Sequence, residues 1–268
     1  MSYRRRIAAM TLAAGLAAPS VLAAPAAQFD EQAALATSQA AIGREVAGFR
    51  FHDTAGRAVM LERYRGKPLV VSLIYTGCNN TCPVITQTLI DALSAAEEVF
   101  GTNAFAAVTV GFDAAQDTPE RMRAFRRDQG VRLTNWTFLS GDAPTIDALA
   151  RTIGFAFTPS PAGYDHMVQT TILDGEGRIY RQVYGDDFAA PSLVEPLKAL
   201  IFGTEASILS LDGLIDRVRL FCTVYNPSSG RYRFDYSLFI GMAAGLSVLG
   251  FLAFLLLREW RRTRAGPA

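Results

Sequence analysis

Apolar residues along the chain form two kinds of pattern, which are nearly continuous runs and repeats at helical spacing. The runs Leu69–Tyr75 and Phe105–Phe112 are almost entirely apolar, which is typical of central strands covered on both faces. After each run, apolar residues recur three or four positions apart, which indicates helices with one buried face. The chain therefore predicts alternating strands and helices.

The remaining pattern adds two hairpins. Alternating Phe49 and Phe51, a turn at 53–56, and then Val59 and Leu61 predict an opening hairpin. A second hairpin is predicted around the turn DGEG at 174–177. Helices are expected at 31–38, 83–100, 143–153 and 192–202. A further helix is expected after Thr118, which would cap it, with Pro119 in its first turn. Further strands are expected at 136–139, 168–173 and 179–184. Because strands separated by helices imply parallel crossovers, we expect an α/β fold, a central mixed sheet flanked by helices with an N-terminal hairpin.

The N-terminal end is typical of a secretory signal peptide over residues 1–26. Arg4, Arg5 and Arg6 precede an apolar, small-residue stretch at 7–24. An uncleaved anchor is the alternative, although Pro19 interrupts the stretch. Residues 27–42 then form a linker with the short helix.

The C-terminal end predicts a transmembrane helix. Residues 236–257 are 22 residues without a charge, which is long enough to cross the hydrocarbon core of a bilayer. A buried core helix is the alternative, but no amphipathic face is visible. The basic tail at 258–268 carries Arg258, Arg261, Arg262 and Arg264 and is expected in the cytoplasm. The domain at 43–203 is then exported, and a membrane-proximal extension at 204–235, which could hold a helix at 211–218, joins it to the membrane.

Composition excludes several classes of protein. The 26 Lys and Arg nearly balance the 25 Asp and Glu, so no basic excess favours nucleic-acid binding. With 50% hydrophobic and 19% charged residues, the chain is not disordered. The two histidines exclude a metal site made of many imidazoles, and the three cysteines can be considered one by one.

The first central strand is followed by TGCNNTCP, in which Cys78 and Cys82 are four positions apart. The pair lies between a strand end and a helix start, where sites of open α/β sheets form. Helix amides and the helix dipole favour a thiolate there. Metal ligation and dithiol redox chemistry are the functional interpretations, and a static disulfide is the structural one, although closing so short a loop stabilises little.

His166 is the third candidate, on a loop after 158–163 and just before a strand that could lie beside the first central one. A single histidine is ordinarily a surface or core residue. His52 is expected to face solvent, and Cys222 to be a small buried hydrophobe. Two thiolates and one imidazole form a soft ligand set of low coordination number, which favours copper over four-coordinate zinc.

The segments FRFHDTAG, TGCNNTCP, VGFDAAQDTPERMRAF and YDHMVQTTILDGEGRIY occur in this order between residues 43 and 202. In these segments the chain resembles the SCO/SenC family of copper chaperones for cytochrome c oxidase assembly. The resemblance implies a thioredoxin-like fold, Cu(I) and Cu(II) as cargo, and Cys78, Cys82 and His166 as ligands. It also implies the dinuclear copper centre of oxidase subunit II, or a related copper site, as acceptor, and an upstream copper donor or thiol reductant as partner. The domain would face the periplasm from a single C-terminal span in a bacterial inner membrane.

The chain departs from the family pattern at three places. Asn79, Asn80 and Thr81 stand between the cysteines, where an aspartate and a proline are more usual, Ala114 replaces a frequent proline, and the anchor is C-terminal. Two other functions remain open. A thiol-disulfide oxidoreductase would use the redox dithiol Cys78 and Cys82 without metal, and a non-catalytic assembly or sensor subunit would report their redox state. Asp113 and Asp117 are expected to be structural.

Overall fold

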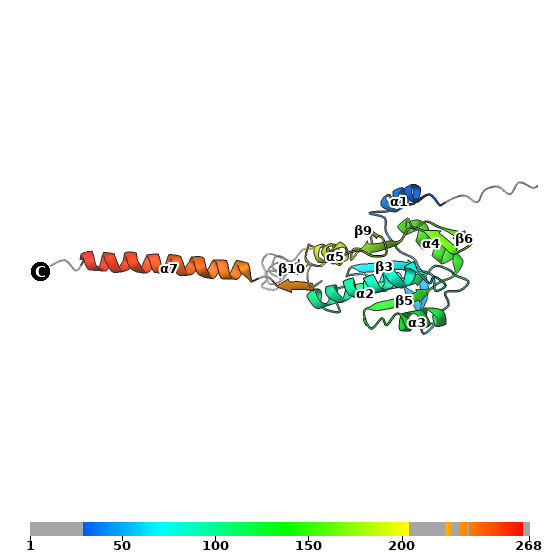
Figure 1. Ribbon diagram of the computed structural model, residues 1–268, viewed down its shortest axis with the longest axis horizontal. Coiled ribbons are helices and arrows are strands. Elements are labelled where there is room, and N and C mark those ends of the chain that lie inside the picture. Colours follow the sequence, from blue (N-terminus) through cyan, green and yellow to red (C-terminus); the bar gives the residue numbers. More distant parts are fainter. Residues whose placement is uncertain (1–28, 204–222, 227–230, 235, 265–268) are drawn as a thin grey trace, which may run out of the picture.

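A seven-stranded mixed sheet forms the centre of the molecule, in the order β2-β1-β5-β4-β3-β8-β9 (Figure 1). The computed structural model describes residues 29–203, 223–226, 231–234 and 236–264. The sheet strands are β1 (Arg50–Asp53), β2 (Ala58–Met60), β3 (Leu69–Ile74), β4 (Ala106–Gly111), β5 (Trp136–Ser140), β8 (Gln169–Leu173) and β9 (Ile179–Tyr184). β3, β4 and β5 are parallel, and the other pairings are antiparallel. The expected α/β fold with a mixed sheet and an N-terminal hairpin is confirmed.

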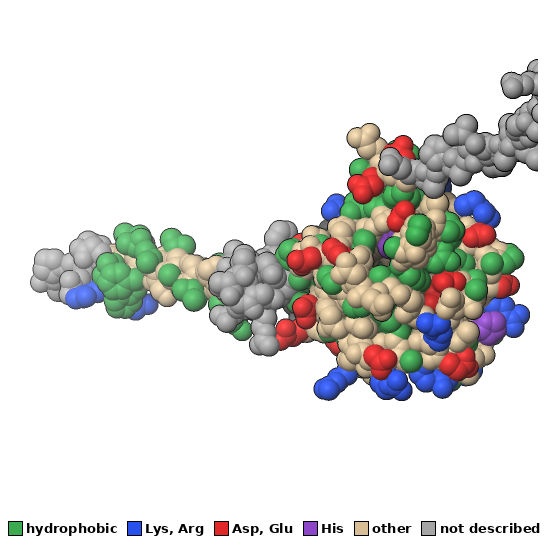
Figure 2. All heavy atoms as spheres, turned by 45° about the vertical axis from the view of Figure 1, so that its right-hand side comes forward, with side chains coloured by type: hydrophobic (Ala, Val, Ile, Leu, Met, Phe, Trp, Pro, Cys, Tyr) green, Lys and Arg blue, Asp and Glu red, His purple; other side chains and the backbone are tan. Residues whose placement is uncertain are grey.

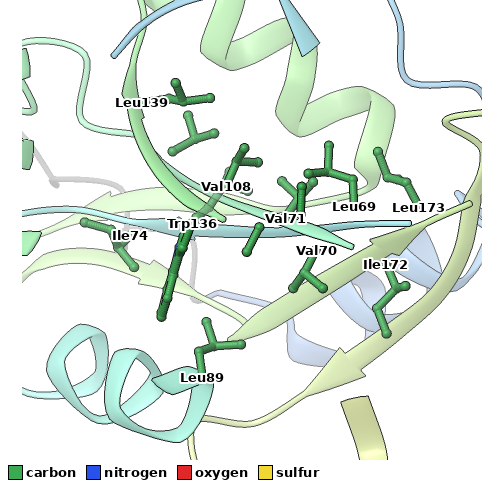
Figure 3. Close-up of a cluster of buried hydrophobic side chains, with 14 of the residues drawn as sticks. Leu69, Val70, Val71, Ile74, Leu89, Val108, Trp136, Leu139, Ile172 and Leu173 are labelled. Carbon is green, nitrogen blue, oxygen red and sulfur yellow. The ribbon is translucent and has the colours of Figure 1, made fainter. Parts of the chain in front are cut away.

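Helices cover both faces of this sheet. They are α1 (Glu31–Gln39), α2 (Thr81–Phe100), α3 (Pro119–Asp128), α4 (Ala143–Ile153) and α5 (Pro191–Gly203), with a short 3-10 helix at Leu61–Tyr64. Figures 1 and 3 show α2 and α4 on opposite faces. Because both faces are covered, every residue of β3 and β4 is buried, as their apolar runs predict.

The core lies between the sheet and these helices. In Figure 3, Val70 of β3 and Ile172 of β8 point to the face on which Leu89 of α2 lies. The polar groups inside this core bond one another: the Trp136 indole N–H donates to the Thr109 hydroxyl oxygen at 2.8 Å, and the Ser72 and Thr109 hydroxyl oxygens are 2.7 Å apart. Bonded in this way, they are buried at little cost.

Helix starts follow the expected capping chemistry. The Thr118 side chain accepts a hydrogen bond from the Arg121 backbone N–H, and Pro119 occupies the first turn. α4 ends at Gly154, whose left-handed φ of +69° favours glycine. α2 differs slightly from expectation, since it begins at Thr81 and so includes Cys82 in its first turn.

One expectation was wrong. His166 is expected on a loop after residues 158–163, but it ends a strand of a separate two-stranded antiparallel sheet, which consists of β6 (Phe157–Ser160) and β7 (Gly163–His166). Two prolines and two glycines in and around this segment are typical of turns, and its short strands carry no long apolar run. The pattern therefore gave little sign of a hairpin.

The chain ends in the helix α7 (Ser237–Arg264), which follows the antiparallel pair β10 (Thr223–Asn226) and β11 (Arg231–Phe234). Its part Phe239–Arg258 is long and apolar enough to cross a membrane, and none of its most apolar window is buried. Figure 2 shows apolar side chains on its open surface, away from the domain. The expected signal peptide at 1–26, the helix considered at 211–218 and Cys222 lie outside the described residues.

Candidate metal and thiol site

Both candidate cysteines lie where β3 passes into α2. Cys78 is half-buried in the turn, and Cys82 is 1% exposed in the first turn of the helix. The helix has no side-chain cap at Asn80, but the Cys82 backbone N–H donates to the Cys78 Sγ at 3.3 Å. The sulfur thus takes one of the backbone donors that a helix start leaves without a partner. Pro83 is tolerated because it stands in this same first turn.

The two thiols have opposite electrostatic surroundings. Burial disfavours the Cys78 thiolate, but the N–H groups of Cys82 and Asn80, the Cys82 thiol and the Tyr75 hydroxyl outweigh it and lower the pKa of Cys78. Burial dominates at Cys82 and raises its pKa far above that of a free thiol. Cys78 is therefore the thiol that ionises first, and both cysteines are free in this structure.

Asp117 fixes the turn from a neighbouring loop. Its buried carboxylate accepts from the Thr76 backbone N–H at 2.8 Å, the Thr76 hydroxyl at 2.7 Å and the Asp113 N–H at 2.9 Å. Burial raises the pKa of Asp117 in spite of these bonds. A Cβ at Gly111 would lie 2.4 Å from the Asp117 Cβ, so glycine is needed there for the carboxylate to fit. Asp117 holds the structural position expected for it, in a loop 41 residues from Thr76.

His166 ends β7, opposite Phe157 in register. Its ring packs against Phe112 and Phe155, with centroids 5.4 and 5.5 Å away, and its Nδ1 lies 3.3 Å from the Met167 carbonyl oxygen. Burial lowers the pKa of His166, so the neutral imidazole that can ligate a metal is favoured. As expected, β8 follows His166 directly and lies beside β3.

Cys78 and His166 line one pocket of about 280 Å³, together with Tyr75, Tyr164 and five other residues. Cys82 lies behind Cys78 and does not line the pocket. Within the described part of the chain, no three His, Cys, Asp or Glu side chains are gathered closely enough to hold a metal ion. The structure thus brings His166 to the same pocket as Cys78 without closing a three-ligand set.

Two further residues of the pocket were not anticipated from the sequence. Tyr75 follows the last residue of β3, and Tyr164 lies in β7; their ring centroids are 5.3 Å apart. In the sequence, Tyr75 closes an apolar run and is indistinguishable from a core residue. His52 is exposed, as expected.

The site lies at the end of the domain that is farthest from α7. Phe100 at the end of α2 contacts Phe202 near the end of α5, with ring centroids 5.7 Å apart, and this end of the domain is the one nearer to α7 (Figure 1). The cysteines lie at the start of α2, which has 20 residues and is therefore about 30 Å long. The pocket therefore lies at the end of the domain away from α7.

Comparison with known proteins agrees with the geometry. The sequence model of the family described as SCO1/SenC matches residues 37–201. The SCO1 protein homolog of Bacillus subtilis (strain 168) is 24% identical over 147 residues, which are 53% of this chain and 74% of that protein. A SCO1/SenC family lipoprotein from Bacillus anthracis str. Ames is 20% identical with a TM-score of 0.54, covering 59% of this chain and 95% of its own. Bradyrhizobium japonicum ScoI with copper bound is 22% identical with a TM-score of 0.50, covering 58% of this chain and 99% of its own. The expected thioredoxin-like fold is confirmed.

Proposed function

Because this chain belongs to the SCO1/SenC family, whose members are copper-binding proteins involved in cytochrome c oxidase assembly, we propose that it is a membrane-tethered copper metallochaperone. It would deliver copper to the dinuclear copper centre of oxidase subunit II. The observation that carries the proposal is the shared pocket of Cys78 and His166, with Cys82 directly behind Cys78.

Cys78, Cys82 and His166 are the proposed copper ligands. Two sulfurs suit Cu(I), and the imidazole extends the set toward Cu(II). The donor chemistry fits copper, while the side chains must approach one another to share one ion. Transfer would proceed by ligand exchange, in which ligands of the acceptor replace those of the donor one by one.

Copper titration of the full chain in detergent micelles tests this function. We expect Cys78→Ala and Cys82→Ala each to weaken Cu(I) binding at least about tenfold, because one of two thiolate ligands is lost. His166→Ala should weaken Cu(II) binding and remove its absorption spectrum. Cys222→Ala is the matched control and should bind as wild type does. Equal affinity in wild type and Cys78→Ala would refute the proposal.

A second function is favoured by the difference between the two thiols. A nucleophile of lowered pKa beside a buried thiol of raised pKa is the arrangement that dithiol exchange requires. The protein could thereby reduce the cysteines of its copper acceptor, after an upstream thiol reductant has reduced its own pair. Turnover of a disulfide substrate without metal, unchanged in His166→Ala, would establish this activity and separate it from copper delivery.

For the location, we propose a single C-terminal span in a bacterial inner membrane, with the domain in the periplasm. The support is the apolar stretch Phe239–Arg258 of α7 and the arginines that follow it. A C-terminal fluorescent-protein fusion should fold and fluoresce in the cytoplasm, whereas a C-terminal alkaline phosphatase fusion should be inactive. The reverse result would show that the C-terminus lies in the periplasm and the domain in the cytoplasm.

A further inference from the structure

Tyr75 touches both halves of the candidate site. Its ring is 8% exposed, and its centroid lies 5.3 Å from that of Tyr164 and 6.3 Å from that of His166. Its hydroxyl lies near enough to the Cys78 thiol and to the backbone N–H of Tyr164 for both to influence the pKa of Tyr75. One side chain therefore connects the cysteine turn to the β6–β7 hairpin.

The absence of a side chain at Gly163 leaves room for the Tyr75 hydroxyl. A Cβ on Gly163 would lie 2.7 Å from the Tyr75 Oη, which is closer than real Cβ atoms come to other atoms, and 3.1 Å from its Cε2, which is tighter than most Cβ contacts. The φ of Gly163 is +121°, a conformation that residues with a Cβ rarely adopt. The backbone of the hairpin thus rests directly on the phenol.

On the basis of the copper function proposed above, we propose that Tyr75 is a latch. Its hydroxyl holds the β6–β7 hairpin against the Cys78 thiol in the metal-free protein, and it must release before His166 and the sulfurs can share one copper ion.

The latch follows from two features of the pocket. The three ligands are not gathered in this structure, so binding one ion requires His166 and Cys78 to move relative to each other. Tyr75 contacts both and lines the same pocket, so this movement must change its contacts. A state that must be left before binding lowers the apparent rate and affinity in proportion to its population. Tyr75 is thus a positioning residue and not a ligand.

Tyr75→Phe in the full chain tests the latch, because it keeps the ring packing and removes only the hydroxyl. Without metal, we expect amide hydrogen exchange of residues 163–166 to become about two- to tenfold faster, as for the loss of one hydrogen bond. The His166-dependent Cu(II) absorption should then develop faster by a similar factor. A residue with a merely structural role would instead slow or weaken copper binding.

Two variants keep the test decisive. Tyr180→Phe removes an exposed tyrosine hydroxyl from β9, outside the pocket, and it should leave both the exchange of residues 163–166 and the copper kinetics unchanged. Gly163→Ala displaces the Tyr75 hydroxyl by sterics and should act in the same direction as Tyr75→Phe, so it serves if that variant does not fold.

Each outcome decides a different point. Unchanged exchange in Tyr75→Phe overturns the latch, and faster exchange with unchanged copper kinetics overturns its role in ligation. If wild type binds no copper, the proposed function fails, while the exchange measurement still decides whether Tyr75 holds the hairpin.

Discussion

The β3–α2 turn, which carries both cysteines, is built into the central sheet, whereas the β6–β7 hairpin, which carries His166, is a separate two-stranded sheet. The turn follows a strand that is buried throughout, and Asp117 holds it with two hydrogen bonds, from the Thr76 N–H and the Thr76 hydroxyl. None of the eight strand residues of this hairpin is fully buried, and His166 is held mainly by aromatic contacts. The thiols therefore have a fixed support and the imidazole an adjustable one.

This difference suits a protein that must both take up and release a metal ion. Ligand exchange needs at least one ligand that can leave at low cost, while the others keep the ion in place. A ligand on a small, partly exposed sheet can move without disturbing the core, because few buried contacts depend on its position. The following predictions test this contrast, from the largest expected effect to the smallest.

Leu89→Ala should destabilise the packing of α2, the helix that follows the cysteine turn. Leu89 lies in α2 and is 1% exposed, so its truncation leaves a cavity and should lower the free energy of unfolding by about 2–5 kcal/mol. Thr158→Ala in the exposed part of β6 should change it by no more than about 0.5 kcal/mol. Urea unfolding followed by circular dichroism measures both variants. Similar losses of unfolding free energy in the two would contradict the difference between the cysteine turn and the β6–β7 hairpin.

Asp117→Ala should loosen the turn without removing core volume from α2. The Thr76 N–H, the Thr76 hydroxyl and the Asp113 N–H would lose their acceptor, at a cost of about 1–3 kcal/mol in the free energy of unfolding. The variant should also make Cys78 more accessible to thiol reagents. Asp113→Ala, which keeps the Asp113 N–H donor, is the control. A stability equal to wild type would show that the hydrogen bonds accepted by Asp117 contribute little to stability.

Thiol alkylation should distinguish the two cysteines within the turn. In a Cys222→Ala background, the reaction of Cys78 should reach its half-maximal rate at a pH below that of a free thiol, because its pKa is lowered. Cys82, buried and of raised pKa, should react at least about tenfold more slowly until the protein unfolds. Cys78→Ser isolates Cys82, and the urea-unfolded chain gives the reference. Equal rates in the folded protein would contradict the assignment.

His166 should give the metal-free protein a shallow pH dependence of stability. Burial lowers its pKa below the ordinary value of 6.5, so the unfolded chain binds the proton more readily. Stability should therefore fall as the pH decreases below about 6.5. His166→Gln should flatten this slope in urea unfolding at pH 5–7, whereas His52→Gln at the exposed position should not. An unchanged slope in His166→Gln would mean that the imidazole does not report the folding of the hairpin.

Much of the fold could be predicted from local pattern. The runs at β3 and β4, the cap and proline of α3 and the turn between β8 and β9 each depend on neighbours a few positions apart, and each was confirmed. The β6–β7 hairpin escaped prediction because its two strands lack a long apolar run and contain turn-forming residues.

The sequence by itself determined the α/β alternation, the apolar stretch of α7 and the position of two cysteines at a strand end, because spacing and hydrophobicity are local properties. Only the tertiary structure decided which residues surround those sulfurs. Thr76 meets Asp117 across 41 positions, and Tyr75 meets His166 across 91, through strand pairings that no local pattern encodes. The burial that separates the pKa values of Cys78 and Cys82 likewise exists only after the sheet and α2 have packed together.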